Sequence, residues 1–234
     1  GSAACTLCSR GKYSTATAAI SEATCQGCPS YSYSGAGSGL LTNCSCNKGY
    51  TRSDGASCVA CIAGTYKAVN GNEACTDCGA GKYSTASAAT AESTCSACTA
   101  NSNALPGSTA SSDCTCNTGF TGDHTMCDPV CGDGKRVGNE GCDDGNAASN
   151  DGCSSTCTIE CGCACSGGTV NTADTCVSTC GDGIQTMAEA CDDGNTDARD
   201  GCGAGCALED GFVCSNLSCG QSSCYLNQSV RACS

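Results

Sequence analysis

The stretch that decides the fold is Cys8-SRGKYSTATAAISEAT-Cys25-QG-Cys28, because it returns seventy residues later as Cys78-GAGKYSTASAATAEST-Cys95-SA-Cys98. The register of the two copies continues through Cys44-S-Cys46 and Cys114-T-Cys116. Between the copies, Cys58-VA-Cys61-IAGTYKAVNGNEA-Cys75-TD-Cys78 is another segment of the same kind. A fixed period of cysteines predicts tandem repeats of one small structural unit.

Cysteine supplies 31 of the 234 residues, whereas Leu, Ile, Val and Phe together supply only 21. So small an apolar content cannot offset the backbone entropy of about 1 to 2 kcal/mol per residue that folding costs. A cysteine content above roughly 8 to 10% indicates a disulfide scaffold, in which each bridge contributes about 3 kcal/mol. Because structural disulfides persist in oxidising surroundings, we expect an extracellular protein, secreted or part of a cell-surface appendage.

The acidic charge and the hydropathy of the chain exclude several partners. The formal net charge is -13 at pH 7, which repels phosphate backbones and argues against nucleic acid as a partner. No run of 18 apolar residues occurs, so the sequence predicts no membrane span. No signal peptide is present at Gly1, and we expect a mature or trimmed chain.

Two local patterns identify the N-terminal repeats. An aromatic residue stands five positions after a cysteine at Tyr13, Tyr33, Tyr66 and Tyr83, although Asn103 breaks the pattern. We expect each of these rings to lie across a neighbouring disulfide. Each Cys-x-Cys is followed by Asn-x-Gly-aromatic, as in the second half of an epidermal-growth-factor-like module. Residues 5–127 thus resemble the ephrin-receptor-like and tumour-necrosis-factor-receptor-like cysteine-rich repeats of extracellular proteins, which serve as spacers, ligand-binding stalks or assembly units.

A second repeat follows. Cys131-GDGKRVGNEG-Cys142-DDGNAASNDG-Cys153-SST-Cys157 returns at an offset of forty-nine as Cys180-GDGIQTMAEA-Cys191-DDGNTDARDG-Cys202-GAG-Cys206. This pattern resembles a cysteine-rich repeat of secreted and surface proteins of protists, algae and some bacteria, including components of flagellar hairs (mastigonemes). The resemblance assigns no module to Cys161, Cys163 and Cys165 between the copies, or to Cys214, Cys219, Cys224 and Cys233 in the tail.

The fold class that follows is a tandem array of small disulfide-rich modules with short β-hairpins, little regular secondary structure and the form of an elongated rod. We divide the chain into residues 1–127 with the ephrin-receptor-like and epidermal-growth-factor-like repeats, 128–179 with the first CGDG/CDDGN repeat, and 180–234 with the second repeat and a cysteine-rich tail.

Loop closure favours disulfides between sequence neighbours, because loops of this size close readily and the two sulfurs of a Cys-x-x-Cys usually have different partners. Interlaced pairing is the alternative. The predicted pairs are Cys8 with Cys25, Cys28 with Cys44, Cys46 with Cys58, Cys61 with Cys75, and Cys78 with Cys95.

The odd number of cysteines leaves at least one sulfur without a partner in the chain. Neighbour pairing from Cys8 to Cys127 leaves Cys5 over, and Cys5 is therefore a candidate for a disulfide to another protomer. Loss of a partner through trimming ahead of Gly1, or a local bridge from Cys5 to Cys25, is the alternative.

Zinc competes with disulfides, since Cys5-x2-Cys8-x16-Cys25-x2-Cys28 and Cys75-x2-Cys78-x16-Cys95-x2-Cys98 have the spacing of four-cysteine ribbon sites. Successive pairs would then have to be shared between neighbouring metals, which disfavours this interpretation. No strand-helix-strand pattern supports a thioredoxin-like thiol.

The acidic turns of the second repeat are the candidate metal site. Carboxylate and amide oxygens beside glycines suit calcium, which takes 6 to 8 oxygen ligands. The alternative is turn chemistry, in which Asp side chains accept hydrogen bonds from nearby backbone amides. The candidate ligands of this structural calcium, the one cofactor we consider, are Asp143, Asp144, Asn146, Asp151, Asp192, Asp193, Asn195 and Asp200.

Catalytic motifs are missing from the sequence, and we predict that the protein is not an enzyme. His124 is the single histidine, and it lies in a polar Gly-Asp-His loop where a solvated side chain is the simpler interpretation. The sequence has no nucleophile elbow, phosphate-binding glycine loop or His-Glu-x-x-His motif.

Glycans are predicted covalent partners. Asn43, Asn216 and Asn227 each begin an Asn-x-Ser sequon, although a cysteine inside the Asn43 sequon weakens it. The Ser/Thr/Ala stretches at residues 14–24 and 84–94 are candidates for O-linked sugars.

These observations predict a structural subunit of an extracellular filament, appendage or surface coat, which self-associates into a polymer and is cross-linked by disulfides. A receptor-type ligand-binding ectodomain or a calcium-dependent adhesin is the second interpretation, and a protease-inhibitor-like module is the third.

Overall fold

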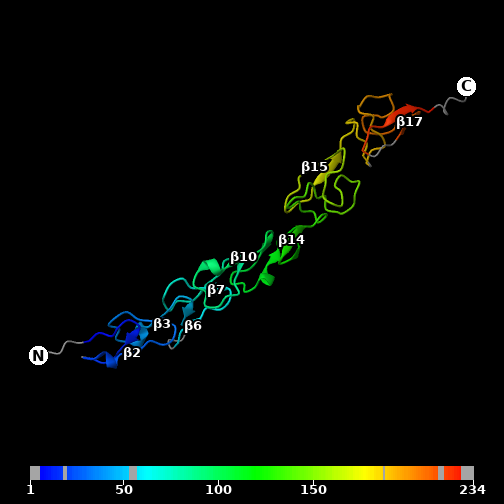
Figure 1. Cartoon of the computed structure of the whole chain (residues 1–234). Coiled ribbons are helices and arrows are strands. Elements are labelled where there is room, and N and C mark those ends of the chain that lie inside the picture. The colour runs from blue at the N-terminus through cyan, green and yellow to red at the C-terminus, as the bar shows by residue number, and fades with distance from the viewer. Residues whose placement is uncertain (1–5, 18–19, 53–56, 187, 216–218, 228–234) are drawn as a thin grey trace, which may run out of the picture. The chain divides into compact units, whose positions relative to one another are not determined.

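The computed structural model describes residues 6–17, 20–52, 57–186, 188–215 and 219–227 (Figure 1). Over these residues the chain forms short antiparallel strand pairs and four single-turn 3-10 helices, η1 (Glu22–Thr24), η2 (Leu41–Asn43), η3 (Glu92–Thr94) and η4 (Ser111–Asp113). No helix in this part of the chain has the length and apolar character that crossing a membrane requires. The predicted fold class of small disulfide-rich modules with short hairpins is confirmed.

The chain divides into two compact units. The N-terminal unit holds Gly1–Asn117 and Gly122–Cys127, and the C-terminal unit holds Thr118–Thr121 and Asp128–Ser234. The hairpins of the N-terminal unit are β1 (Lys12–Tyr13) with β2 (Gln26–Gly27), β3 (Ser32–Tyr33) with β4 (Ser45–Cys46), β5 (Tyr50–Thr51) with β6 (Val59–Ala60), β7 (Thr65–Tyr66) with β8 (Thr76–Asp77), β9 (Lys82–Tyr83) with β10 (Ser96–Ala97), and β11 (Ser102–Asn103) with β12 (Thr115–Cys116). A seventh hairpin, β13 (Phe120–Asp123) with β14 (Met126–Pro129), contains residues of both units.

Each of these seven hairpins is a module closed by one disulfide between sequence neighbours. The five predicted pairs are confirmed, and the series continues with Cys98–Cys114 and Cys116–Cys127. Sequence separations of 11 to 17 residues give about 3 kcal/mol per bridge in the chain-entropy model. In the four Cys-x-x-Cys pairs from Cys25–Cys28 to Cys95–Cys98, the first sulfur closes one module and the second opens the next, so each pair links two modules.

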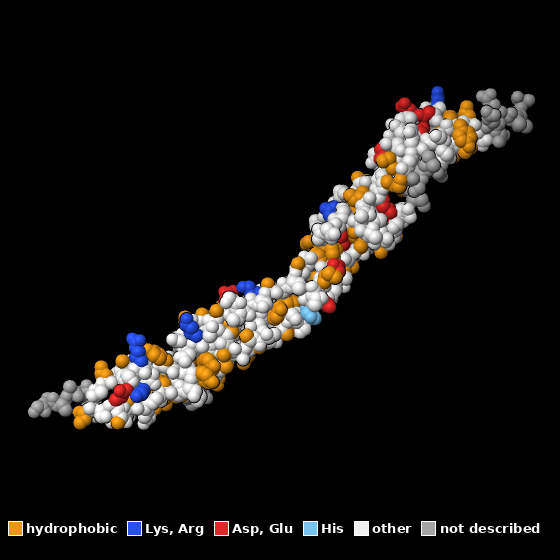
Figure 2. Space-filling view, in the orientation of Figure 1, with side chains coloured by type: hydrophobic (Ala, Val, Ile, Leu, Met, Phe, Trp, Pro, Cys, Tyr) orange, Lys and Arg blue, Asp and Glu red, His pale blue; other side chains and the backbone are white. Residues whose placement is uncertain are grey.

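Sulfur forms the core of the N-terminal unit. Its buried hydrophobic residues are half-cystines, with Ala89 and Ala104 as the exceptions. The aromatic rings expected in this role stay near the surface, since Tyr33 is 39% exposed and Tyr13, Tyr66 and Tyr83 are half-buried. Larger apolar side chains remain in solvent, as Leu105 does at 80% exposure, and Figure 2 shows hydrophobic side chains scattered among polar ones.

Backbone hydrogen bonds join successive modules in a repeating two-way pattern. A glycine N–H at the first strand of one module donates to a carbonyl of the next, and a loop N–H of that next module donates back to the carbonyl of the first half-cystine. The forward bonds are Gly11 to Ser34, Gly49 to Lys67, Gly64 to Ser84 and Gly81 to Ala104, and the return bonds are Gly37 to Cys8, Gly71 to Cys46, Ala88 to Cys61 and Gly107 to Cys78, all between 2.8 and 3.0 Å.

Glycine is required at some of these positions by close approach as well as by backbone angle. Gly64 has a φ of +80°, and a Cβ there would lie 2.1 Å from the carbonyl oxygen of Gly107. Gly11 has nearly the same φ, +78°, but no atom lies within 4 Å of the corresponding Cβ. An alanine at Gly11 would therefore have only an unfavourable backbone angle, whereas an alanine at Gly64 would also clash with Gly107.

We predict that Gly64→Ala destabilises its module by about 1 to 3 kcal/mol more than Gly11→Ala, which carries only the left-handed backbone cost of about 1 kcal/mol. Native-state hydrogen exchange of the Gly64 and Gly107 amides measures the local opening free energy. Equal effects of the two substitutions would contradict the close approach of Gly64 and Gly107.

The C-terminal unit contains two CGDG repeats, residues 131–178 and 180–226, whose disulfides follow a different rule. An outer bridge encloses an inner one, and a third bridge crosses the following hairpin. The bridges are Cys131–Cys157, Cys142–Cys153 and Cys165–Cys176 in the first repeat, and Cys180–Cys206, Cys191–Cys202 and Cys214–Cys224 in the second. The neighbour rule is therefore wrong for the outer bridges, because the turns of each repeat fold back on themselves.

The hairpins of the C-terminal unit are β15 (Cys163–Ser166) with β16 (Thr175–Ser178) and β17 (Phe212–Ser215) with β18 (Ser223–Leu226). Their half-cystines are direct cross-strand neighbours, Cys165 opposite Cys176 and Cys214 opposite Cys224. Cys161–Cys219 joins the two repeats across a separation of 58 residues.

Candidate functional site

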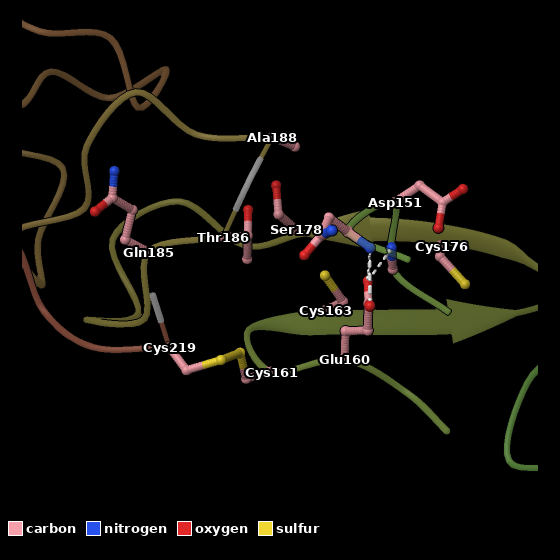
Figure 3. Close-up of a pocket in the computed structure, with 12 residues that line it drawn as sticks. Asp151, Glu160, Cys161, Cys163, Cys176, Ser178, Gln185, Thr186, Ala188 and Cys219 are labelled. Carbon is pink, nitrogen blue, oxygen red and sulfur yellow. Dashed lines mark hydrogen bonds between the residues drawn. A yellow bond between two sulfur atoms is a disulfide. The ribbon is translucent and has the colours of Figure 1, made fainter. Parts of the chain in front are cut away.

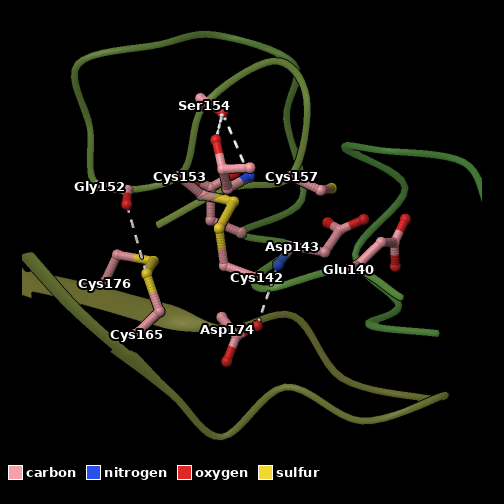
Figure 4. The surroundings of a disulfide bond; sticks show 12 residues. Glu140, Cys142, Asp143, Gly152, Cys153, Ser154, Cys157, Cys165, Asp174 and Cys176 are labelled. Carbon is pink, nitrogen blue, oxygen red and sulfur yellow. Dashed lines mark hydrogen bonds between the residues drawn. A yellow bond between two sulfur atoms is a disulfide. The ribbon is translucent and has the colours of Figure 1, made fainter. Parts of the chain in front are cut away.

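The first aspartate of each Cys-Asp-Asp-Gly segment is the centre of its repeat. Asp143, labelled in Figure 4, is fully buried. Its carboxylate accepts three backbone hydrogen bonds of 2.9 Å from the N–H groups of Gly132, Gly134 and Gly145. Asp192 accepts the equivalent bonds of 2.8 to 3.0 Å from Gly181, Gly183 and Gly194. The glycines of the signature have positive φ angles that turn their N–H groups inward.

The backbone of the same aspartate holds the following hairpin. In the first repeat, the N–H of Asp143 donates to the side chain of Asp174 at 3.0 Å, and the N–H of Asp174 donates to the Asp143 carbonyl at 2.6 Å. Arg136 pairs with Asp174 at 3.1 Å.

The second repeat makes the same connection with neutral groups. Ser222 accepts from the N–H of Asp192 at 3.1 Å, and the Ser222 hydroxyl donates to Gln185 at 3.1 Å. Gln185 and Ser222 thus take the place of the Arg136–Asp174 ion pair of the first repeat. In both repeats the pair connects the buried aspartate to the following hairpin.

We predict that Asp192→Asn destabilises the second repeat by about 2 to 4 kcal/mol, because an amide nitrogen would face backbone N–H donors in a buried position. Asp197→Asn is the matched control, since Asp197 is exposed and belongs to the same loop. Hydrogen exchange of the Gly181 and Gly183 amides, with the thermal midpoint, measures both variants. Similar protection in the two variants would show that the buried carboxylate does not organise the turn.

The remaining acids of the first turn lie together on an exposed loop. The side-chain nitrogen of Asn146 donates to Asp144 at 3.1 Å and to Asp151 at 2.9 Å, while its oxygen accepts from the N–H of Ala148 at 2.6 Å. Burial raises the pKa of Asp144, and the charge of Asp151 adds to the rise.

In the second turn, Asn195 likewise donates to Asp200 at 3.0 Å and accepts from the N–H of Asp197 at 2.6 Å. No hydrogen bond within the described residues links Asp193 to this pair, and its buried Oδ1 has no partner. The structure therefore brings Asp144, Asn146 and Asp151 together but turns Asp143 and Asp192 inward.

A calcium ion among the three loop side chains would require the Asn146 amide to turn over, which would break its bond to Ala148. Calcium on these loop residues stays a prediction.

Sequence reasoning missed Glu140 and Glu189, which stand three residues before the buried aspartates. Glu140 accepts from the N–H of Val137 at 2.7 Å, and Glu189 accepts from the N–H of Thr186 at 3.0 Å. Burial raises the pKa of Glu140, the bond from Val137 opposes that rise, and the charge of Asp143 adds to it. The identical Glu-x-x-Asp spacing in the two repeats was the available signal.

Cys163 is a free thiol among the described residues. It lies at the start of β15 opposite Ser178, where the second repeat has Phe212. Its sulfur borders a cavity of about 300 Å³ that is also lined by Asp151, Glu160, Gln185 and the Cys161–Cys219 bridge (Figure 3). Burial raises the pKa of the Cys163 thiol, and the neighbouring carboxylates, Glu160 first, raise it further.

We predict that Cys163 is alkylated more slowly than a cysteine in an unstructured peptide at pH 8, because the raised pKa lowers the thiolate fraction. The alkylation rate of Cys163 should rise with pH as the thiol ionises, and the midpoint of this rise should lie at a higher pH than for the peptide cysteine. Differential alkylation with mass spectrometry of the Cys163 peptide measures both rates, and a faster reaction at Cys163 would contradict the prediction.

The other predicted modification sites are only partly described. Asn43 is exposed at the end of η2, and the cysteine within its sequon is the buried half-cystine Cys44. Asn227 is half-buried, and its N–H donates to the Gly211 carbonyl at 2.7 Å. Cys5, Asn216 and the last two residues of the Asn227 sequon lie outside the described residues.

Together, the hairpin modules and the CGDG turns define the chain as an array of cysteine-rich repeats. Residues 113–158 and 162–207 each match the model of a domain of unknown function, DUF4215. Residues 49–95 match the model of the tyrosine-protein kinase ephrin type A/B receptor-like repeat. No curated protein matches the chain. The repeats and the fourteen disulfides of the described residues are of the extracellular type.

Proposed function

We propose that the chain is a non-enzymatic structural subunit of an extracellular filament, appendage or surface coat. The observation that carries the proposal is the repeated interlock of the N-terminal unit. Each module has its own disulfide, and backbone hydrogen bonds run in both directions between the first two modules and along the series from Cys46–Cys58 to Cys98–Cys114. Such nearest-neighbour contacts let an array grow by adding modules without enlarging a common core.

The use of the acidic side chains supports a structural role over catalysis. Asp143 and Asp192 bind glycine amides, and Glu160 accepts from the N–H groups of Asn150 and Gly152 at 2.8 and 2.9 Å. Glu209 makes the equivalent contacts in the second repeat. These carboxylates hold turns in place, whereas a general acid or base needs to reach a substrate.

The cavity beside Cys163 favours a second candidate, a receptor-type ligand-binding ectodomain. Its volume of about 300 Å³ is at the lower end of the range for small-molecule sites. Asp151, Glu160 and Gln185 add acidic and polar groups to a wall that cysteines also line, which suits a small ligand with a cationic or hydrogen-bonding group and an apolar part.

Negative-stain microscopy of purified protein, with light scattering over a concentration series, tests the proposal. We predict fibres or concentration-dependent oligomers, and denaturing gels without reductant should show covalent multimers that decrease in a Cys5→Ser variant. Cys163→Ser is the matched control for the other candidate thiol. Monomers at every concentration would contradict the filament proposal and favour the receptor-type alternative.

A further inference from the structure

A second acidic pair recurs beneath the CGDG turns, away from the exposed loops. Glu140 and Asp143 in the first repeat correspond to Glu189 and Asp192 at the offset of forty-nine. In each repeat, one carboxylate oxygen from each acid lies within 4.8 Å of the other and of a half-cystine sulfur, Cys157 or Cys206. Figure 4 shows the Asp143 and Glu140 carboxyl groups side by side next to Cys157.

The hydrogen bonds of the second repeat leave part of this pair unsatisfied. Asp192 Oδ1 accepts from two glycine N–H groups, whereas Oδ2 accepts from the Gly181 N–H alone, which leaves it a lone pair. Glu189 is only 8% exposed, its Oε2 accepts from Thr186, and its buried Oε1 has no partner in the described structure. An acceptor buried without a donor is costly, and this one lies beside a second carboxylate.

In the first repeat Glu140 likewise has a carboxylate oxygen without a hydrogen-bond partner among the described residues, and a cavity beside it has room for a ligand. Glu140 Oε1 is also buried without a partner. A cavity of about 200 Å³ lies against Glu140 and Cys157, and Asn139 and Thr156 contribute polar side chains to its wall. Such a cavity gives a hydrated ion access to the Glu140 side of the pair and space for the waters that complete its coordination.

We propose that the buried carboxyl pair of each CGDG repeat, Glu140 with Asp143 and Glu189 with Asp192, binds a hard divalent cation of the calcium type. Calcium–oxygen distances of about 2.3 to 2.6 Å allow one ion to bind two oxygens that are up to about 5 Å apart. The nearby sulfurs belong to the bridges Cys131–Cys157 and Cys180–Cys206, so they are not thiolates, and the site disfavours zinc.

The cation would join segments that are otherwise held by backbone contacts. Asp192 already gathers the glycines at both ends of the turn, and Glu189 fixes the stretch between them through the Thr186 N–H. An ion on both acids therefore binds the folded turn more tightly than the unfolded chain, which stabilises the repeat by mass action.

Calorimetric titration of the full chain with calcium chloride, after treatment with chelator, tests the site. We expect two sites per chain in the wild type and at least about a tenfold loss of affinity in a Glu140→Gln/Glu189→Gln variant, since ligand charge sets calcium affinity. The matched control is Asp151→Asn/Asp200→Asn, which removes the same charge from the exposed loops. This variant should bind as the wild type does if the buried pairs hold the ions, and should lose affinity if the loop residues predicted from the sequence hold them instead.

A wild-type measurement guards against misfolding of the variants. Crystals of the unmodified chain soaked in a manganese salt should show anomalous density between Glu189 and Asp192. Absence of calcium binding by the wild type, equal binding by the glutamate variant, loss of binding in the loop variant alone, or water without an ion at the carboxyl pair would each overturn the proposal.

Discussion

The burial of half-cystines is the constraint on which the rest of the structure depends. Cys44, Cys46, Cys142 and Cys191 are completely buried, and few larger apolar side chains accompany them. A disulfide restricts the unfolded chain while occupying little volume, so a module of under twenty residues can be ordered without the aliphatic core that a compact domain needs. The consequence is that each module has almost no interior, and successive modules are joined by backbone hydrogen bonds together with surface side-chain contacts such as the Tyr31–Tyr50 stack.

Buried aspartate has the equivalent role in the CGDG repeats. The amide donors of a tight glycine turn need acceptors once they leave water, and Asp143 satisfies three of them with one side chain. The signature follows from this arrangement. Cys-Gly-Asp-Gly supplies two donors, Asp-Asp-Gly supplies the acceptor and the third donor, and the glycine of Asp-Gly-Cys leaves room for the hairpin disulfide, whose Cys176 Cβ would lie 2.4 Å from a Cβ at Gly152.

The sequence predicted the N-terminal unit better than the C-terminal unit for a physical reason. Neighbour pairing succeeds where each loop closes independently, as between Cys8 and Cys25. It fails for Cys131–Cys157, because that bridge depends on how a polar turn folds over Asp143.

The Asp-Asp pattern of the sequence likewise shows two acids without showing that the first points inward, since residue type alone does not give side-chain direction. At the offset of forty-nine, both Cys161 and Cys163 lack a cysteine counterpart, so the sequence could not show that Cys161 pairs with Cys219 and that Cys163 stays free.

Comparison of the two CGDG repeats shows which residues the fold of the repeat keeps and which it allows to change. Both keep the buried aspartate, the glutamate three residues before it and the nested bridges, whereas Arg136 and Asp174 become Gln185 and Ser222. An ion pair in one repeat and a neutral hydrogen bond in the other occupy the same place beside the hairpin, so the framework accepts either. The free thiol of Cys163, replaced by the Phe212 ring in the other copy, lies beside a cavity. Chemistry specific to this chain is therefore best sought where the repeats diverge, while the shared acidic pair belongs to the repeat itself.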